Sequence, residues 1–309
     1  MSHYVNAAAI HFRNRSTRGA PGATQEVLDQ LKQGLEQLED SNIDLVLTCE
    51  GVESIGQTLE QAESPDEPGP FYTTYRDFAI RNKATVAGSI KFKEDGKVYN
   101  SIVIIGPDGN YLGDYRKTFL TQGERELGLT RGNGPVVVNT PAGRLGGVIC
   151  FDLNYDELRN GYHKLKPDIM LFSSMFHGEH LQQSWAHHCR SYFISACKDN
   201  NSDIVDPLGR VIQSINFHGR VVRARLNLDR FIMHQDVNMR QFRDIYRKYG
   251  NGVSIDFNPK LGQAILYCES NGTTAPEIAR EFELTPLDDY LTNSKNALPS
   301  VTMEGRVMP

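Results

Sequence analysis

Apolar runs of strand length alternate with helix-like segments along the first 250 residues, and this alternation constrains the fold more than any other feature of the sequence. Residues 24–38 carry apolar side chains at spacings of three and four, which is typical of a helix with one buried face. Residues 43–47 are mostly leucine and β-branched, which is typical of a buried strand. Hairpins are predicted where Pro and Gly stand between two apolar runs, at residues 107–109, 141–143 and 207–209. Because helices and strands interleave while hairpins are frequent, we expect an α/β fold in which mixed sheets are covered by helices.

The same patterns predict the remaining elements. Further helices are expected at residues 71–82, 154–164, 181–190 and 229–248, and further strands at residues 5–12, 85–92, 168–173, 192–197 and 220–226. From about residue 251 the chain becomes more polar, and residues 274–290 have the spacing of one amphipathic helix. We therefore expect a main domain at residues 1–250 and a C-terminal extension at residues 251–309, which packs on that domain or on a neighbouring subunit.

Charge and cysteine content argue against several classes of protein. Lys and Arg number 33 and Asp and Glu number 38, so the formal net charge is −5 and nucleic acid is not expected as a partner. The sequence contains no run of about 18 apolar residues, the length that could span a membrane, and the N-terminus lacks a signal-peptide pattern. The five cysteines are an odd number without CxxC spacing, which argues against a disulfide framework. We therefore expect a cytoplasmic protein that does not associate with membranes.

Cys150 stands where an apolar run of strand length meets a predicted helix. Two glycines and two β-branched residues precede it. A cysteine at such a turn lies near backbone N–H groups and a helix N-terminus, which favour the thiolate and can bind a developing oxyanion. The alternative is a buried structural cysteine, because free cysteine is among the most buried residue types. Cys150 is therefore a candidate nucleophile.

Glu50 and Lys117 stand at the ends of two other strand-like runs. Glu50 could act as a general base, and Lys117 could bind an oxyanion as a fixed positive charge. A solvated loop acid and a surface lysine are the alternatives when each residue is considered alone. Together with Cys150 they supply a base, a charge and a nucleophile, which is a complete set for acyl transfer. Active sites of α/β folds are commonly assembled at strand ends, which favours this interpretation.

The chain resembles the nitrilase superfamily of carbon–nitrogen hydrolases in the segments that carry these three residues. Glu50 lies in "TCEG", Lys117 in "YRKTFL" and Cys150 in "GGVICFDLNYDELR", and their separations of 67 and 33 residues also match the family pattern. Supporting similarity comes from "YNSIVIIGPDGNYLGDYRK" before the lysine and "DPLGRVI" after the cysteine. The resemblance covers roughly residues 4–250.

The resemblance implies an α-β-β-α sandwich whose subunits pair into a four-layer dimer or a larger homo-oligomer, without a metal or an organic cofactor. It also implies a second glutamate in the loop after the lysine, for which Glu124 is the best match and Glu126 is the rival. Glu124 would hold Lys117 and help to position the substrate. The backbone N–H of Phe151 would bind the developing anion. The loop after the strand that ends at residue 173 would supply the substrate contacts Ser174, Met175 and Phe176.

Two departures from the family pattern weaken any substrate assignment by similarity. Phe119 stands where many members have histidine, and Asn154-Tyr-Asp-Glu157 stands where many have Arg-Phe-Pro-Glu. Arg159 and His177 are possible cations for a substrate carboxylate. The expected function is hydrolysis of a small-molecule amide or N-carbamoyl compound through a Cys150 acyl-enzyme, releasing ammonia or an amine. Hydrolysis of a nitrile is the alternative within the family, and a non-catalytic binding protein on the same fold is the alternative from another class.

Overall fold

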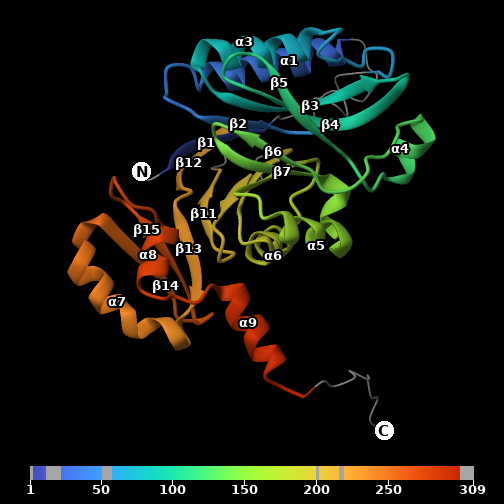
Figure 1. The fold of residues 1–309 in the computed structure, drawn as a ribbon. Coiled ribbons are helices and arrows are strands. Elements are labelled where there is room, and N and C mark those ends of the chain that lie inside the picture. The colour runs from blue at the N-terminus through green and yellow to red at the C-terminus, as the bar shows by residue number, and fades with distance from the viewer. Residues whose placement is uncertain (1–2, 12–21, 51–57, 200–201, 216–218, 300–309) are drawn as a thin grey trace. The chain divides into compact units, whose positions relative to one another are not determined.

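The structure is a computed structural model that describes residues 3–11, 22–50, 58–199, 202–215 and 219–299 (Figure 1). The chain divides into two compact units. Val5–Leu226 form the first, which we call the main unit, and Met1–Tyr4 together with Asn227–Pro309 form the second, which we call the C-terminal unit. None of the described helices is long and apolar enough to cross a lipid bilayer.

The first sheet of the main unit has six strands in the order β12-β1-β2-β3-β4-β5. β1, β2 and β3 pair in parallel, whereas β3, β4 and β5 pair antiparallel. The predicted hairpin at residues 107–109 is confirmed, because it joins β4 to β5. The strands span Tyr4–Ile10 (β1), Leu45–Thr48 (β2), Thr85–Glu94 (β3), Lys97–Ile105 (β4), Tyr111–Arg116 (β5) and Val221–Asn227 (β12).

The second sheet also has six strands, in the order β11-β10-β9-β8-β7-β6. β7, β8 and β9 pair in parallel, and the outer strands pair antiparallel. The other two predicted hairpins join β6 to β7 and β10 to β11, so the expectation of mixed sheets is confirmed. The strands span Val137–Thr140 (β6), Gly143–Ile149 (β7), Ile169–Ser174 (β8), Tyr192–Cys197 (β9), Asp203–Val205 (β10) and Val211–Ser214 (β11).

Helices cover the outer face of each sheet, which produces the expected α-β-β-α sandwich (Figure 1). α1 (Ala23–Glu36) and α3 (Pro70–Asn82) lie on the first sheet, and α5 (Asp156–Leu165) and α6 (His180–Cys189) lie on the second. α1 buries the apolar side chains whose spacing predicted it, including Val27, Leu31 and Leu35. The pairing of subunits into a four-layer dimer stays a prediction.

The two sheets of the main unit bind each other near the ends of β2 and β8. The Ser173 hydroxyl donates to the Thr48 carbonyl at 2.9 Å, and the Cys49 thiol donates to the Ser174 carbonyl at 3.3 Å. All four residues are fully buried, so these bonds form in a medium where an unmade bond is costly. The contacts fix the strand end that precedes Glu50 against the strand end that precedes Met175.

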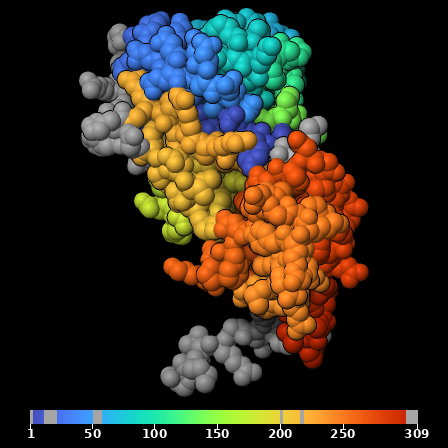
Figure 2. Space-filling view, turned by 90° about the vertical axis from the view of Figure 1, so that its left-hand side faces the viewer, coloured from blue at the N-terminus to red at the C-terminus, as the bar shows by residue number. Residues whose placement is uncertain are grey.

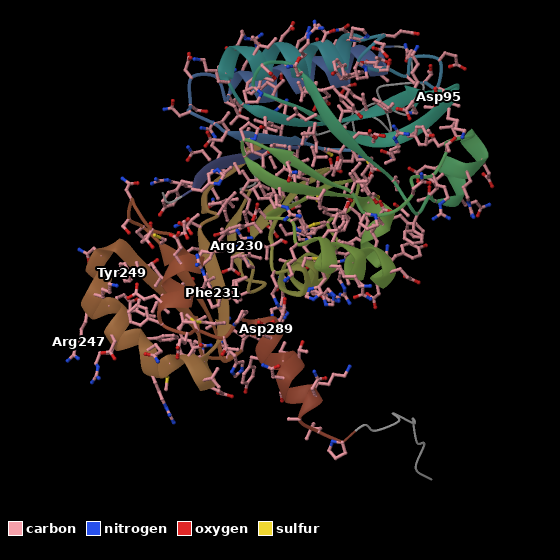
Figure 3. The ribbon with its side chains drawn as sticks, in the orientation of Figure 1. Asp95, Arg230, Phe231, Arg247, Tyr249 and Asp289 are labelled. Carbon is pink, nitrogen blue, oxygen red and sulfur yellow. The ribbon has the colours of Figure 1, made fainter. Side chains whose placement is uncertain are left out.

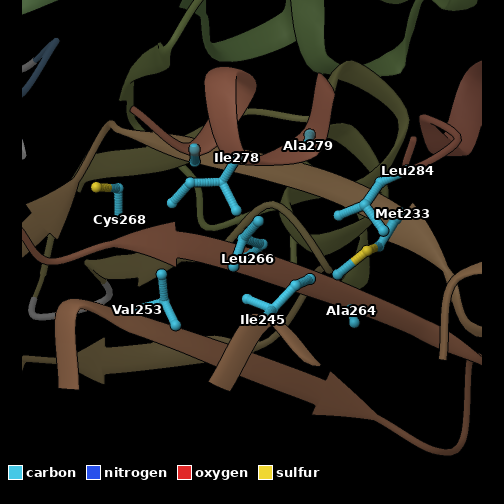
Figure 4. Close-up of a cluster of buried hydrophobic side chains, with 10 residues drawn as sticks. Met233, Ile245, Val253, Ala264, Leu266, Cys268, Ile278, Ala279 and Leu284 are labelled. Carbon is cyan, nitrogen blue, oxygen red and sulfur yellow. The ribbon is translucent and has the colours of Figure 1, made fainter. Parts of the chain in front are cut away.

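The C-terminal unit has a three-stranded antiparallel sheet in the order β13-β15-β14 and its own hydrophobic core. Figure 4 shows this core, in which Met233, Ile245 and Leu266 meet Ile278. The described atoms of the unit form one compact body in the space-filling view, coloured orange to red (Figure 2). Its elements are β13 (Arg230–His234), α7 (Gln235–Tyr249), β14 (Val253–Asn258), β15 (Gln263–Cys268), α8 (Ala275–Glu281) and α9 (Leu287–Asn296).

Two predictions for this unit are wrong. The helix expected at 229–248 begins only at Gln235, because residues 230–234 pair with β15 and bury Met233 in the core. The single helix expected at 274–290 is two helices, α8 and α9. Pro286 stands before α9 and has no N–H to continue a helix that reaches it from α8. The boundary between the two compact units lies at Asn227, and the functional boundary expected at residue 250 stays a prediction.

α7 presents a basic outer surface to solvent. Arg243 and Arg247 are 74% and 70% exposed, and both lie within 3.5 Å of the carboxylate of Asp244, which partly neutralises them. Figure 3 shows Arg247 pointing away from the helix into open space. Exposed pairs of this kind contribute little to stability, so the helix is held by its buried face instead.

The close approach of β5 to β7 gives a test of this packing. Gly147 is buried on β7, and a Cβ added there would lie 2.4 Å from the Cβ of Tyr115. We expect Gly147→Ala to lower the free energy of unfolding by about 1–3 kcal/mol, because one strand must move. Gly123→Ala is the control, since nothing lies within 4 Å of its added Cβ and alanine favours the helix there. Equal stability of the two variants in denaturant titrations would contradict the packing.

Candidate active site

Glu50, Lys117 and Cys150 follow three strands of the main unit, β2, β5 and β7. The structure brings them together. Lys117 Nζ lies 3.1 Å from Glu50 Oε1, and the Glu50 carboxylate is close enough to the Cys150 thiol to raise its pKa. The three residues that the sequence analysis named as base, charge and nucleophile therefore form one cluster at the strand ends.

Lys117 is held between two carboxylates with its side chain 2% exposed. Its Nζ is 2.8 Å from Glu124 Oε1, in addition to its contact with Glu50. Burial opposes a charged lysine, but the two carboxylates outweigh it and raise the pKa of Lys117 above the ordinary value. Lys117 is therefore a fixed cation, since a lysine with such a pKa does not release its proton near neutral pH.

The two carboxylate oxygens of Glu124 have different partners, a helix N-terminus and Lys117. Its Oε2 accepts hydrogen bonds from the backbone N–H and the hydroxyl of Thr121. The Thr121 hydroxyl in turn accepts from the Glu124 N–H, so the two residues form a capping box for α4 (Gln122–Leu127). Its Oε1 faces Lys117. Burial would raise the pKa of Glu124, but Lys117 and the hydrogen bonds lower it. Glu126 instead is exposed and accepts a bond from Gln122, so the structure places Glu124 and not Glu126 against the lysine.

Asn100, which the sequence analysis did not single out, joins the two carboxylates. Its Nδ2 donates to Glu50 Oε1 at 3.0 Å and to Glu124 Oε1 at 2.9 Å, and the side chain is fully buried on β4. The backbone carbonyl of Asn100 also accepts from the backbone N–H of Lys117 at 2.9 Å. The sequence signal that could have identified Asn100 was a polar side chain inside a largely apolar strand, because a buried polar group needs a hydrogen-bond partner.

Cys150 is a neutral thiol in this arrangement. Burial and the charge of Glu50 raise the pKa of Cys150 to about 12, although Lys117 opposes the rise. The expectation that the turn would favour a thiolate is wrong, because burial and the neighbouring carboxylate outweigh the N–H groups. The thiol must therefore lose its proton to a base at the moment of attack.

The loop after β8 contacts Glu50 through backbone and not through side chains. The N–H of Met175 donates to Glu50 Oε2 at 3.0 Å. The Ser174 hydroxyl accepts from the N–H of Phe176 and donates to its carbonyl, so this side chain serves the loop itself. Phe151 and Phe176 are each more than a third exposed. The roles of Phe151, Ser174, Met175 and Phe176 in substrate binding stay predictions.

The two cations considered for a substrate carboxylate already have partners. Arg159 donates to the Ser184 hydroxyl and lies 2.8 Å from Asp156. His177 Nε2 is 3.0 Å from Asp203 Oδ2, and its Nδ1 accepts from the N–H of Glu179. Both side chains are therefore occupied in stabilising their own surroundings.

Comparison with protein families and curated proteins gives a consistent result. A family model described as carbon-nitrogen hydrolase matches residues 20–231, which is more than half of the chain. An omega-amidase from Xenopus tropicalis is 28% identical over 169 residues, covering 47% of this chain and 61% of that protein. A deaminated glutathione amidase from Mus musculus is 27% identical over 192 residues, covering 53% and 59%. The alignments thus span about 60% of the length of these relatives.

Solved structures share the fold of the main unit. Nit3 of Saccharomyces cerevisiae, a member of branch 10 of the nitrilase superfamily, superposes with a TM-score of 0.60 at 19% identity, covering 72% of this chain and 90% of that one. An amidase from Nesterenkonia sp. gives a TM-score of 0.60 at 17% identity, covering 79% and 96%. At this level of identity the likeness establishes the fold.

The pairing of Glu124 with Lys117 predicts a pH-dependent stabilisation. Glu124→Gln should lower the free energy of unfolding by about 1–3 kcal/mol at pH 7, because Lys117 stays buried with one carboxylate fewer. Since the pKa of Glu124 is lowered in the folded protein, its contribution is complete above the unfolded value of about 4.3 and is lost as the pH falls below it. Denaturant titrations at several pH values measure the difference.

Glu126→Gln is the matched control for this experiment. Glu126 is exposed and lies in the same short helix, so its substitution should change stability by less than about 0.5 kcal/mol at every pH. A pH-independent effect of Glu124→Gln, or an equal effect of both variants, would show that the Lys117 contact contributes nothing measurable.

Proposed function

The chain belongs to the carbon-nitrogen hydrolase family, and we propose that it hydrolyses a small-molecule amide or N-carbamoyl compound through a Cys150 acyl-enzyme. One observation carries the proposal. A neutral thiol beside the carboxylate of Glu50, which raises its pKa, lies in a cluster with a buried lysine that stays charged. This arrangement supplies a nucleophile, its base and a fixed cation, the three requirements of acyl transfer.

In the first half of the reaction, Glu50 takes the proton of Cys150 as Sγ attacks the carbonyl carbon. A negative charge develops on the carbonyl oxygen, and Lys117 and the N–H of Phe151 stabilise it. The C–N bond then breaks, and Glu50 transfers the proton to the departing nitrogen. Ammonia or an amine leaves, and the acyl group remains on Cys150 as a thioester.

In the second half, water replaces the amine. Glu50 takes a proton from the water molecule while its oxygen attacks the thioester carbon. Lys117 again stabilises the anion. The C–S bond breaks, the proton returns to Cys150, and a carboxylic acid leaves. The net reaction consumes one water molecule for each C–N bond cleaved.

The fixed cation and the neutral thiol favour this proton path. Because the pKa of Cys150 is raised to about 12, little thiolate is present near neutral pH, so attack and proton transfer must be coupled. Lys117 is a poor alternative base, since its own pKa is raised. Glu50 is the carboxylate beside the thiol and is thus suited to carry the proton in both directions.

The proposal extends to the setting of the enzyme. The five cysteines, which all lie within the described residues, form no disulfide with one another, which suits a reducing cytoplasm. We also propose a homodimer or a larger homo-oligomer, as the family resemblance implies. Sedimentation of the purified protein would measure the oligomer directly.

Ammonia release from a panel of small amides, N-carbamoyl amino acids and nitriles tests the function. We expect turnover of an amide or N-carbamoyl compound by the wild type and a loss of at least about 10⁴-fold in Cys150→Ala, because the variant lacks the thiol beside Glu50 and Lys117. Cys189→Ala is the control. Cys189 is buried at the end of α6, where its thiol contacts the backbone carbonyl of Arg159 on α5, and it should be dispensable for the reaction. Turnover that persists in Cys150→Ala would contradict the mechanism, and turnover of nitriles alone would assign the alternative chemistry.

A further inference from the structure

The backbone of Cys150 is strained. Its φ is +48°, in the left-handed region that residues other than glycine rarely adopt. The residue opens a short 3-10 helix, η1 (Cys150–Asn154), directly after β7. Such a conformation costs about 1–2 kcal/mol and persists only where the surroundings hold it. The structure must therefore contain a group that fixes this turn.

Asp152 is that group. Its side chain is fully buried and accepts three hydrogen bonds. Oδ2 accepts from the N–H of Ile149 at 3.2 Å and from the hydroxyl of Tyr115 at 2.7 Å, and Oδ1 accepts from the N–H of Phe119 at 2.7 Å. Hydrogen bonds to a carboxylate are stronger than neutral ones, especially where water is excluded.

The three donors have a common relation to the candidate catalytic residues. Ile149 and Asp152 flank Cys150 in the sequence, and Tyr115 and Phe119 stand two residues before and after Lys117. One carboxylate therefore binds the chain on both sides of the thiol and on both sides of the lysine. The two segments come from different sheets, so no backbone ladder sets their distance.

We propose that Asp152 is a positioning residue that sets the geometry of Cys150 relative to Lys117, in its ionised form. The inference rests on the proposed function only for its catalytic meaning, because the contacts and the strained turn exist whatever the substrate. A protonated carboxyl would lose one acceptor site and its charge, so its hydrogen bonds from the three donors would weaken. The turn at Cys150 would then loosen, and its Sγ would move away from the direction of productive attack.

The surroundings of Asp152 make this ionisation titrate near neutral pH. Burial raises the pKa of Asp152 to about 7, while the hydrogen bonds and the charge of Lys117 hold it from rising further. Tyr115 on β5 and Tyr162 on α5 also face it, and both have pKa values above the ordinary range, so they stay neutral. Asp152 is therefore ionised and holds its three donors strongly above about pH 7, and it loses this role as the pH falls below that value.

The test measures the reactivity of Cys150 itself. Alkylation by iodoacetamide, followed on the Cys150 peptide by mass spectrometry from pH 5.5 to 8.5, requires no hydrolysis and remains readable if every amide of the panel is rejected. The ratio of wild-type to Asp152→Asn rates cancels the titration of the thiol at pH values well below its pKa. We expect this ratio to approach 1 at pH 5.5 and to rise to about 10-fold or more at pH 8.

Tyr115→Phe distinguishes positioning from a general effect on folding. The substitution removes one hydrogen-bond donor that lowers the pKa of Asp152. The increase in alkylation rate that accompanies ionisation of Asp152 should therefore occur at higher pH. Thermal unfolding of each variant at pH 8 accompanies the measurement. If Asp152→Asn does not fold, the ratio of wild-type to Tyr115→Phe rates decides the question, because it cancels the thiol titration in the same way and should vary with pH near 7. A ratio that does not vary with pH, or a midpoint that Tyr115→Phe leaves in place, would overturn the proposal.

Discussion

The buried ion cluster of Lys117 with Glu50 and Glu124 is the interaction on which the rest of the candidate site depends. A lysine charge removed from water costs several kcal/mol unless partners of opposite charge and good geometry surround it. Here both carboxylates lie within 3.1 Å, and Asn100 donates to each of them. The cluster carries one excess negative charge, which makes Glu50 a suitable acceptor for the thiol proton.

The fold supplies this cluster by ending strands of two sheets at the same place. β2, β5 and β7 deliver Glu50, Lys117 and Cys150, and the capping box of α4 delivers Glu124. The backbone N–H of Met175 then fixes the remaining oxygen of Glu50. Because each group is held by main-chain geometry, the site needs little reorganisation when charge develops during a reaction.

The sequence predicted those parts of the structure that produce local patterns. Glu50, Lys117 and Cys150 could be found because each stands at the end of a strand-like run, and Glu124 because of a family resemblance. Asn100 and Asp152 were missed, since one buried polar residue in an apolar segment does not reveal its partners across two sheets. Helical spacing over 274–290 was misleading in the C-terminal unit, where Pro286 outweighs it. The ionisation of Cys150 also depends on burial, which no local pattern encodes.

The most direct test of this account is the detection of the acyl-enzyme. The wild-type protein would be mixed with an amide that it turns over, quenched in acid at short times and digested for mass spectrometry. The account predicts that the Cys150 peptide gains the mass of the acyl group and that hydroxylamine removes this group. Turnover that leaves this peptide unmodified at every quench time, with no hydroxamate formed when hydroxylamine is present, would contradict the role of Cys150 as the nucleophile.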